Sequence, residues 1–193
     1  MKHSPLILAS ASPQRKFLLR RLGIPFRIAP SRISETSRSR EPRALVLELA
    51  LRKARAVAAG HERGLVLGAD TIVFCAGEIL FKPQSQKDSA RILNLLNGRW
   101  HRVYTGVALV DVSSGISWRA VAVTRVKARK LSAAELQSLV GKHMDKAGAY
   151  AVQDRSDPFI ERIEGDLDNV IGLPLAIVRN LLRKAASLRT ALA

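Results

Sequence analysis

The apolar residues of the chain fall into short runs and periodic stripes that predict interleaved strands and helices. Short apolar runs between turn residues are typical of buried strands, and apolar positions three and four residues apart are typical of helices. The expected strands cover residues 6–9, 26–29, 65–74, 79–81, 103–111, 116–128, 150–152 and 159–164. The expected helices cover residues 14–22, 42–59, 85–96, 132–140 and 172–188.

Capping signals support two of these helices. Ser85 with Asp88, and Ser132 with Glu135, have the spacing of a capping box at a helix start. Strands and helices interleave without strict alternation, and the central strands follow one another as hairpins. This order predicts an α/β fold with a mixed, twisted β-sheet flanked by helices, rather than a fully parallel doubly wound sheet. Because no repeat or linker is visible, residues 1–193 are expected to form a single domain.

The composition is typical of a globular chain with a substantial core. Of the 193 residues, 47% are hydrophobic, which argues against intrinsic disorder. No apolar run reaches the ~18 residues of a membrane-spanning helix, and the stretch at residues 5–9 is too short for a signal peptide. The single cysteine, Cys75, excludes an internal disulfide and is expected to be buried. These features predict a cytoplasmic protein that does not associate with membranes.

The charge balance narrows the class of partner. Lysine and arginine number 32 against 16 acidic residues, a formal net charge of +16. Such a charge favours a nucleic acid, an anionic membrane or a phosphorylated small molecule. The excess lies in residues 1–130, whereas residues 131–193 are neutral. Because aromatic residues are only 5% of the chain and no basic tail is present, nucleic acid is not expected to be the main partner. A basic nucleic-acid-binding protein stays the alternative.

A lysine interrupts the apolar stripe of the helix expected at residues 42–59. Lys53 falls on the face formed by Val46, Leu49, Ala50 and Val57. It must either pair with a charged group or reach a cleft, or its stem must run past the stripe to water. The face expected to be exposed carries Glu48, Arg52 and Arg55.

Asp70 interrupts the apolar run at residues 65–74. A carboxylate at the end of a central strand is a frequent catalytic placement, because open sheets bind ligands at strand ends. Gly68 and Ala69 are expected to leave room for a ligand beside it. The alternative is an aspartate that caps a neighbouring backbone amide.

Two further positions suit an anion. Lys82 follows an apolar strand and precedes Pro83, which favours an extended backbone and a cation fixed for a phosphate; a solvated strand end is the alternative. Ser12 and Arg15 lie where a strand passes into a helix, and helix N-termini favour anions. Ser12 can equally be a plain helix cap.

The histidines point to no metal centre. His3, His61, His101 and His143 lie outside zinc-binding patterns and are expected on the surface or in loops. The remaining set of cations, a carboxylate and an anion-ready helix start suits a phosphorylated substrate attacked by water. The carboxylate would serve as base or metal ligand. The residues alone therefore indicate metal-assisted phosphate-ester or phosphoanhydride chemistry.

Six segments then carry a resemblance to one family, the Maf-like nucleoside triphosphate pyrophosphatases, also known as septum-formation inhibitors. They are LILASASPQR at residues 6–15, GADTIV at 68–73, KP at 82–83, LNGRWHRVYTGV at 96–107, KAGAYAVQ at 146–153 and NVIGLPL at 169–175. Each segment is weak evidence by itself, but six in family order are specific together.

The resemblance implies hydrolysis of a nucleoside triphosphate to the monophosphate and pyrophosphate, with a divalent cation, Mg²⁺ or alternatively Mn²⁺. It also implies a fold similar to that of the inosine triphosphatases, with two lobes around a central cleft, and a homodimer. Carried over, Asp70 is the proton acceptor, and Glu35 with Asp70 is the metal site. The phosphate-binding residues would be Ser12, Arg15, Lys53 and Lys82. A division regulator with incidental catalysis is the competing interpretation.

The resemblance also bears on the choice of base. Thr71 and Gln153 match family members that prefer dTTP and UTP, whereas members acting on 7-methyl-GTP tend to carry Gln and Glu there. Gln14 replaces a family arginine and is expected to contact the substrate. Phe81 replaces a usual glycine, and residues 154–157 replace a glycine-rich turn.

Overall fold

Within the residues that the computed structural model describes, 5–154 and 157–191, seven strands form one mixed sheet. The strand order is β2-β1-β3-β5-β6-β7, and β4 pairs with β3. The strands are β1 (Leu6–Leu8), β2 (Phe26–Ile28), β3 (Leu65–Cys75), β4 (Glu78–Leu80), β5 (Trp100–Asp111), β6 (Ser117–Ala128) and β7 (Ile160–Glu164). Pairing of β1 with β2 and β3 is parallel, whereas β4 with β3 and β7 with β6 are antiparallel. The expected mixed α/β sheet is therefore confirmed.

The helices are α1 (Pro13–Arg20), α2 (Pro42–Ala58), α3 (Gln86–Leu96), α4 (Ala133–Leu139), α5 (Leu167–Ile171) and α6 (Leu175–Ala191). Their starts follow the expected capping chemistry, because Ser85 and Ser132 each accept a backbone N–H three residues ahead. At α4 the capping box is complete. No helix in the described part of the chain is long and apolar enough to cross a membrane.

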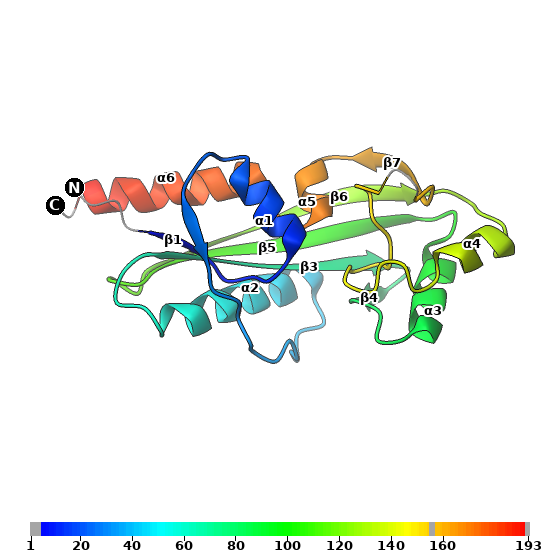
Figure 1. Cartoon of the computed structure of the whole chain (residues 1–193), viewed down its shortest axis with the longest axis horizontal. Coiled ribbons are helices and arrows are strands. Elements are labelled where there is room, and N and C mark those ends of the chain that lie inside the picture. Colours follow the sequence, from blue (N-terminus) through cyan, green and yellow to red (C-terminus); the bar gives the residue numbers. More distant parts are fainter. Residues whose placement is uncertain (1–4, 155–156, 192–193) are drawn as a thin grey trace. The chain divides into compact units, whose positions relative to one another are not determined.

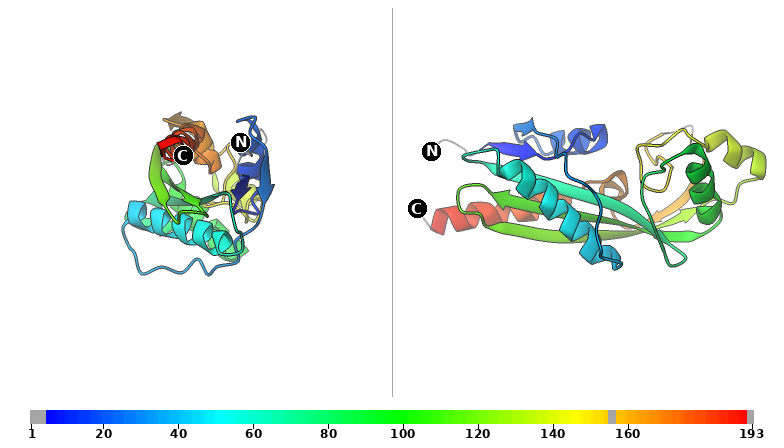
Figure 2. Two further views of the ribbon diagram at one scale, coloured as in Figure 1. Left: turned by 90° about the vertical axis from the view of Figure 1, so that its left-hand side faces the viewer. Right: turned by 90° about the horizontal axis from the view of Figure 1, so that it is seen from below.

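The chain forms two compact units. The first comprises residues 1–70, 105–122 and 172–193, and the second comprises residues 71–104 and 123–171. In the first unit, α2 and α6 lie on opposite faces of the sheet, as Figures 1 and 2 show. One apolar cluster of this unit joins β1, α2, β3 and β5 through Ile7, Ala9, Ala50, Leu51, Ala54, Val57, Val66, Ala108 and Val110.

Two glycines allow α2 to lie against the sheet in the first unit. A Cβ atom at Gly68 would collide with the carbonyl oxygen of Ala50 and would lie 2.9 Å from the backbone nitrogen of Ala54. A Cβ at Gly106 would collide with the carbonyl oxygen of Val46. The expectation that Gly68 leaves room for a ligand is therefore wrong, since the helix backbone occupies that space.

The second unit has its own core, which α3 and α4 form with strands of the sheet. His101 is buried there, and its Nε2 lies 2.9 Å from the hydroxyl of Tyr150. His143 is also buried, and its Nε2 lies 3.2 Å from Asp157 Oδ2. The expected surface or loop position is therefore wrong for His101, which lies in β5, whereas His143 is buried but lies in a turn segment and His61 is exposed as expected. His3 lies outside the described residues, and the buried position of Cys75 is confirmed.

Three other expectations need correction. The strand expected at residues 150–152 does not form, because the N–H of Ala151 donates to the side chain of Asp157 at 2.9 Å rather than to a strand. Helix α5 is an additional element, and its start is marked by Asp166, whose Oδ1 accepts the N–H of Asp168 at 2.8 Å. Asp70 lies inside β3 rather than at its end, because the strand continues to Cys75.

Candidate functional site

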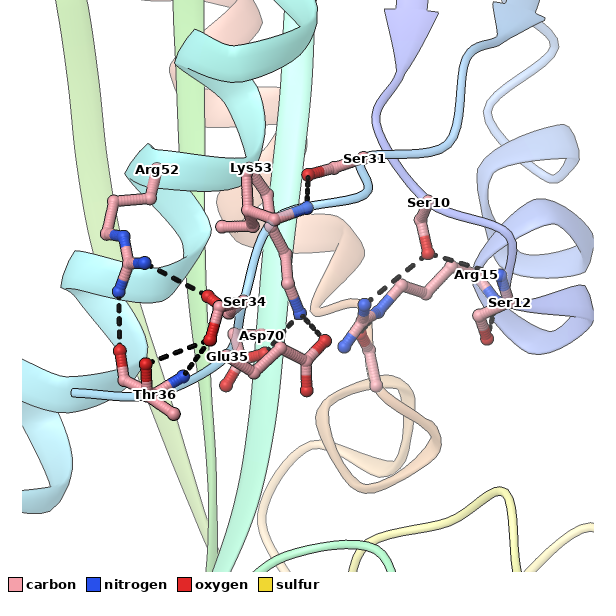
Figure 3. A network of polar contacts seen from close by, with 12 residues as sticks. Ser10, Ser12, Arg15, Ser31, Ser34, Glu35, Thr36, Arg52, Lys53 and Asp70 are labelled. Carbon is pink, nitrogen blue, oxygen red and sulfur yellow. Dashed lines mark hydrogen bonds and ion pairs between the residues drawn. The ribbon is translucent and has the colours of Figure 1, made fainter.

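Lys53 lies at the centre of a charge cluster in the first unit, in which Lys53 and Asp70 are buried and Glu35 is half-exposed. Its Nζ is 2.6 Å from Asp70 Oδ1 and 2.6 Å from Glu35 Oε1 (Figure 3). Lys53 comes from the sheet-facing side of α2, Asp70 from β3, and Glu35 from the segment between β2 and α2. Lys53 and Asp70 are 7% and 5% exposed, so neither charge is solvated. The ammonium therefore pairs with carboxylates, and the alternative that its stem runs past the stripe to water is wrong.

The surroundings of Asp70 make it a stronger base than an ordinary aspartate. Burial raises the pKa of the Asp70 carboxyl, and this effect outweighs the positive charges of Lys53 and Arg15, which lower that pKa. The negative charge of Glu35 raises the pKa of Asp70 further. A carboxylate with a raised pKa, fixed by a hydrogen bond from Lys53, is suited to accept a proton from water.

Arg15 contributes a second cation to the same unit. It belongs to the first turns of α1, where its Nε donates to the carbonyl oxygen of Gly172 at 2.9 Å. Its Nη1 donates to Ser10 Oγ at 3.4 Å (Figure 3). Burial lowers the pKa of Arg15, whereas Asp70 and Glu35 raise it; the guanidinium stays charged, since arginine is not deprotonated in proteins.

Ser12 is the N-cap of α1. Its Oγ accepts the backbone N–H of Arg15 at 3.4 Å and donates to Gln14 Oε1 at 3.0 Å. The capping interpretation is therefore correct, and the same hydroxyl lies at the helix end that favours anions. Gln14 is half-buried, and its Oε1 accepts this hydrogen bond from Ser12.

Three of the expected site residues belong to the second unit. Thr71 follows Asp70 directly in β3 and is half-buried. Lys82 is exposed just after β4, and Gln153 is exposed in the turn that follows Tyr150. Lys82 has the solvated position that the sequence left open as an alternative.

Pattern reasoning missed the residues that hold the charged groups in place. Ser10 and Gly172 both accept hydrogen bonds from Arg15, and both lie in segments that match family motifs. That membership was the only available signal, because a small buried serine and a backbone carbonyl leave no periodic trace. Arg52 is also missed, because helical periodicity places it on the exposed face of α2.

Comparison with known proteins gives the family. The family model for Maf-like protein matches residues 5–185. A dTTP/UTP pyrophosphatase of Moorella thermoacetica is 52% identical over 182 residues, which cover 93% of this chain and 94% of that protein. A dTTP/UTP pyrophosphatase of Elusimicrobium minutum is 47% identical over 179 residues, 93% of this chain and 97% of that protein. The chain belongs to the Maf family. The resemblance seen in six sequence segments is confirmed.

Some charged residues of the candidate site come from segments that match motifs of the Maf family. A dTTP/UTP pyrophosphatase of Thermococcus onnurineus is 46% identical over 178 residues, 91% of this chain and 95% of that protein. In this Maf-family chain, the GADT and SPQR segments supply Asp70 and Arg15, while the NVIGLPL segment supplies the carbonyl of Gly172 that orients Arg15.

The donor set has the chemistry for a divalent cation together with a phosphate substrate. Within the described residues, no group of three or more His, Cys, Asp or Glu side chains could hold a metal by itself. Glu35 and Asp70 converge on one point, at Lys53 Nζ. Mg²⁺ is commonly bound by one or two carboxylates plus substrate phosphates and water, so two carboxylates fit this cation but not a closed zinc centre.

Proposed function

We propose that the chain is a nucleoside triphosphate pyrophosphatase that releases the monophosphate and pyrophosphate, prefers dTTP and UTP, and cleans the nucleotide pool. The observation that carries this proposal is Lys53, buried between the carboxylates of Asp70 and Glu35 in the field of Arg15. Relatives at 47% and 52% identity over most of both chains bear the name of this activity.

In the proposed reaction, Asp70 is the proton acceptor. A water oxygen forms a bond to the α-phosphorus, the proton of that water passes to the Asp70 carboxylate, and the bond from the α-phosphorus to the departing pyrophosphate oxygen breaks. Burial raises the pKa of the Asp70 carboxyl, which favours this transfer, whereas the positive charge of a bound cation would lower that pKa. Lys53 keeps the carboxylate in one orientation through its hydrogen bond to Oδ1.

Cations and a helix start would bind the phosphates. Arg15 presents a guanidinium whose planar fork suits phosphate oxygens, and Ser12 adds a hydroxyl at the start of α1. Lys82 and Lys53 would supply further positive charge. The orientation of Arg15 by Gly172 and Ser10 supports this role, because a fixed fork loses less entropy on binding.

A divalent cation, Mg²⁺ or Mn²⁺, would be held by Glu35 and Asp70 with the substrate phosphates. When bound, the cation would neutralise negative charge on the phosphate oxygens, including the charge that develops in the transition state. The residues Glu35 and Asp70 then serve to bind that cation, and Asp70 also holds the proton.

The base preference rests on Thr71, Gln153 and Gln14. The first two match the pattern of members that prefer dTTP and UTP, and the exposed amide of Gln153 is available for a base edge. If they set the preference, the double variant Thr71→Gln/Gln153→Glu shifts the ratio of kcat/KM away from dTTP and toward 7-methyl-GTP.

The test is a panel of dTTP, UTP, CTP, GTP and modified nucleotides, with pyrophosphate release measured with and without Mg²⁺. We expect dTTP and UTP to give the highest kcat/KM. Asp70→Asn is expected to lose activity by ~10²-fold or more while the chain still folds. A fully active Asp70→Asn variant would contradict the proton-acceptor role, and equal rates on all nucleotides would contradict the pyrimidine preference.

The homodimer and the cytoplasmic location implied by the family stay predictions. Sedimentation equilibrium of the full chain measures the first, and cell fractionation measures the second.

A further inference from the structure

Arg52 binds the backbone on both sides of Glu35. Its Nη1 donates to the carbonyl oxygen of Thr36 at 2.7 Å, and its Nη2 donates to that of Ser34 at 3.0 Å. Figure 3 shows this fork reaching the segment that carries Glu35. Lys53, the next residue of α2, holds the Glu35 carboxylate at 2.6 Å. Two consecutive helix residues therefore fix Glu35, one through its neighbouring backbone and one through its side chain.

The carboxylate of Glu48, on α2, completes the arrangement. Glu48 accepts a hydrogen bond from Arg52 Nη1 at 3.3 Å and another from Ser37 Oγ at 2.7 Å. It lies one turn before Arg52, so the ion pair orients the guanidinium along the helix. The hydroxyls of Ser34 and Thr36 lie 2.9 Å apart and the Thr36 N–H donates to Ser34 Oγ at 3.3 Å, so the segment also has contacts of its own on either side of Glu35.

The segment around Glu35 needs such contacts because no helix or strand hydrogen bonds hold its backbone. Residues 29–41 contain neither helix nor strand, and the side chain of Glu35 is 49% exposed. Ordering a backbone segment costs conformational entropy, so a segment without such contacts would rarely hold the Glu35 carboxylate against Lys53. The two carbonyl contacts of Arg52 supply that order.

We propose that Arg52 is a positioning residue for Glu35. It holds the backbone of residues 34 and 36 so that the Glu35 carboxylate stays at Lys53 and Asp70. The proposal rests on the proposed function for its kinetic consequence, since it assigns Glu35 to the reacting site. It assigns Arg52 no contact with substrate.

Two other roles for Arg52 make different predictions. If only its positive charge attracts the triphosphate, Arg52→Lys retains the effect. If Arg52 only stabilises the fold, its loss lowers the melting temperature without changing the kinetics of the folded protein. A lysine ammonium cannot reproduce a planar fork that spans two carbonyls and a carboxylate, so the positioning role predicts that Lys fails to rescue.

The first experiment is a double-mutant cycle on kcat and KM with dTTP, using Arg52→Met, Arg52→Lys, Glu35→Gln and the Arg52→Met/Glu35→Gln pair. We expect Arg52→Met and Arg52→Lys to lower kcat by about 10-fold or more, since small displacements at a reacting site cost this much. The pair should be no slower than Glu35→Gln within about twofold. Full multiplicative loss in the pair, or wild-type kcat in Arg52→Lys, would overturn the proposal.

The second experiment does not use activity. Arg38 and Arg40 are exposed in the same segment and are sites for trypsin. Arg52→Met should be cleaved there faster than wild type, at a temperature well below its melting transition. The matched control is Arg55→Met, which removes an exposed arginine from the same helix and should be cleaved at the wild-type rate. Equal cleavage of the two variants would contradict the positioning role.

The outcomes separate this proposal from the proposed function. If the wild-type chain hydrolyses no nucleoside triphosphate, the function fails while proteolysis still tests the hold of Arg52 on the segment. If Asp70→Asn abolishes hydrolysis but Arg52→Met keeps wild-type kcat, the function stands and the role of Arg52 is wrong.

Discussion

Lys53 Nζ lies 2.6 Å from Asp70 Oδ1, and both side chains are buried. A lysine on the core face of α2 thus meets an aspartate in the interior of β3. Two buried charges are stable only as a pair, because the desolvation of each is costly unless the other compensates it.

Removing the Lys53 ammonium should destabilise the chain more than removing the Asp70 carboxylate. Lys53→Met leaves Asp70 and Glu35 without their shared partner, and breaking a buried pair in this way costs about 3 kcal/mol or more. Asp70→Asn leaves Lys53 its second carboxylate, Glu35, at 2.6 Å, and it removes a negative charge that burial opposes, since burial raises the pKa of Asp70. We expect its free energy of unfolding to stay within about 1 kcal/mol of wild type. Urea unfolding at pH 7 measures both, and the opposite ranking would contradict the prediction.

Gly68→Ala should destabilise the first unit strongly. The added methyl group would collide with the carbonyl oxygen of Ala50, which is helix backbone and cannot rotate away. We expect a loss of about 3 kcal/mol, since overpacking costs 1–3 kcal/mol and backbone has the least room to yield. Gly60→Ala is the control, because the nearest atom to its Cβ would lie at an ordinary 3.7 Å. Thermal melts of the two variants that coincide would refute the close-approach argument.

Asp157 should be a structural anchor of the second unit. Its Oδ2 accepts the N–H of Ala151 and its Oδ1 accepts that of Phe159, both at 2.9 Å, and its side chain is 2% exposed. Asp157→Ala leaves two donors without acceptors, which predicts a loss of about 2–4 kcal/mol. Asp145→Ala, whose side chain is 56% exposed, should change stability by less than about 0.5 kcal/mol. Equal effects in chemical denaturation would argue against this role.

His101 should make the chain less stable in mild acid. Burial lowers the pKa of His101 from 6.5 to about 4. Between these values the unfolded chain binds a proton that the native chain does not, so the free energy of unfolding falls as the pH drops from 6.5 toward 4. The full shift corresponds to about 3 kcal/mol.

His101→Gln should remove this dependence, while His61→Gln, at an exposed position, should retain it. The measurement is urea unfolding at several values between pH 7 and pH 4. Parallel stability curves for wild type and His101→Gln would show that His101 does not carry the effect.

Much of the fold was predictable because it follows from local pattern. The helix caps at Ser85 and Ser132 and the hairpin between β3 and β4 need only neighbouring residues, and they lie where expected. The strand expected at residues 150–152 failed because a side chain, Asp157, replaces a strand as acceptor for its backbone. The pattern of apolar residues does not reveal that a side chain farther along the chain will accept a backbone hydrogen bond.

For the candidate site, the sequence predicted the two buried charges but not the contacts between them and the neighbouring segments. Lys53 and Asp70 were evident as charges in apolar surroundings, and burial confirms both. Arg52 was expected to be solvated, because periodicity gives a residue's face on a helix but not the segments that later cover that face. His101 was misplaced because β5 begins at Trp100, whereas the strand was expected to begin at residue 103.

Helical periodicity placed Lys53 on the core side of α2, because the period of a helix depends only on backbone geometry, and Asp70 was evident as a charge within an apolar run. The sequence also determined the family, through six segments in order. The ammonium that Glu35 and Asp70 share, and the contacts of Arg52 with the backbone around Glu35, could not be predicted before the folded structure was known. The reason is that these contacts join separate segments, and their distances depend on how closely α2 approaches the sheet at Gly68 and Gly106.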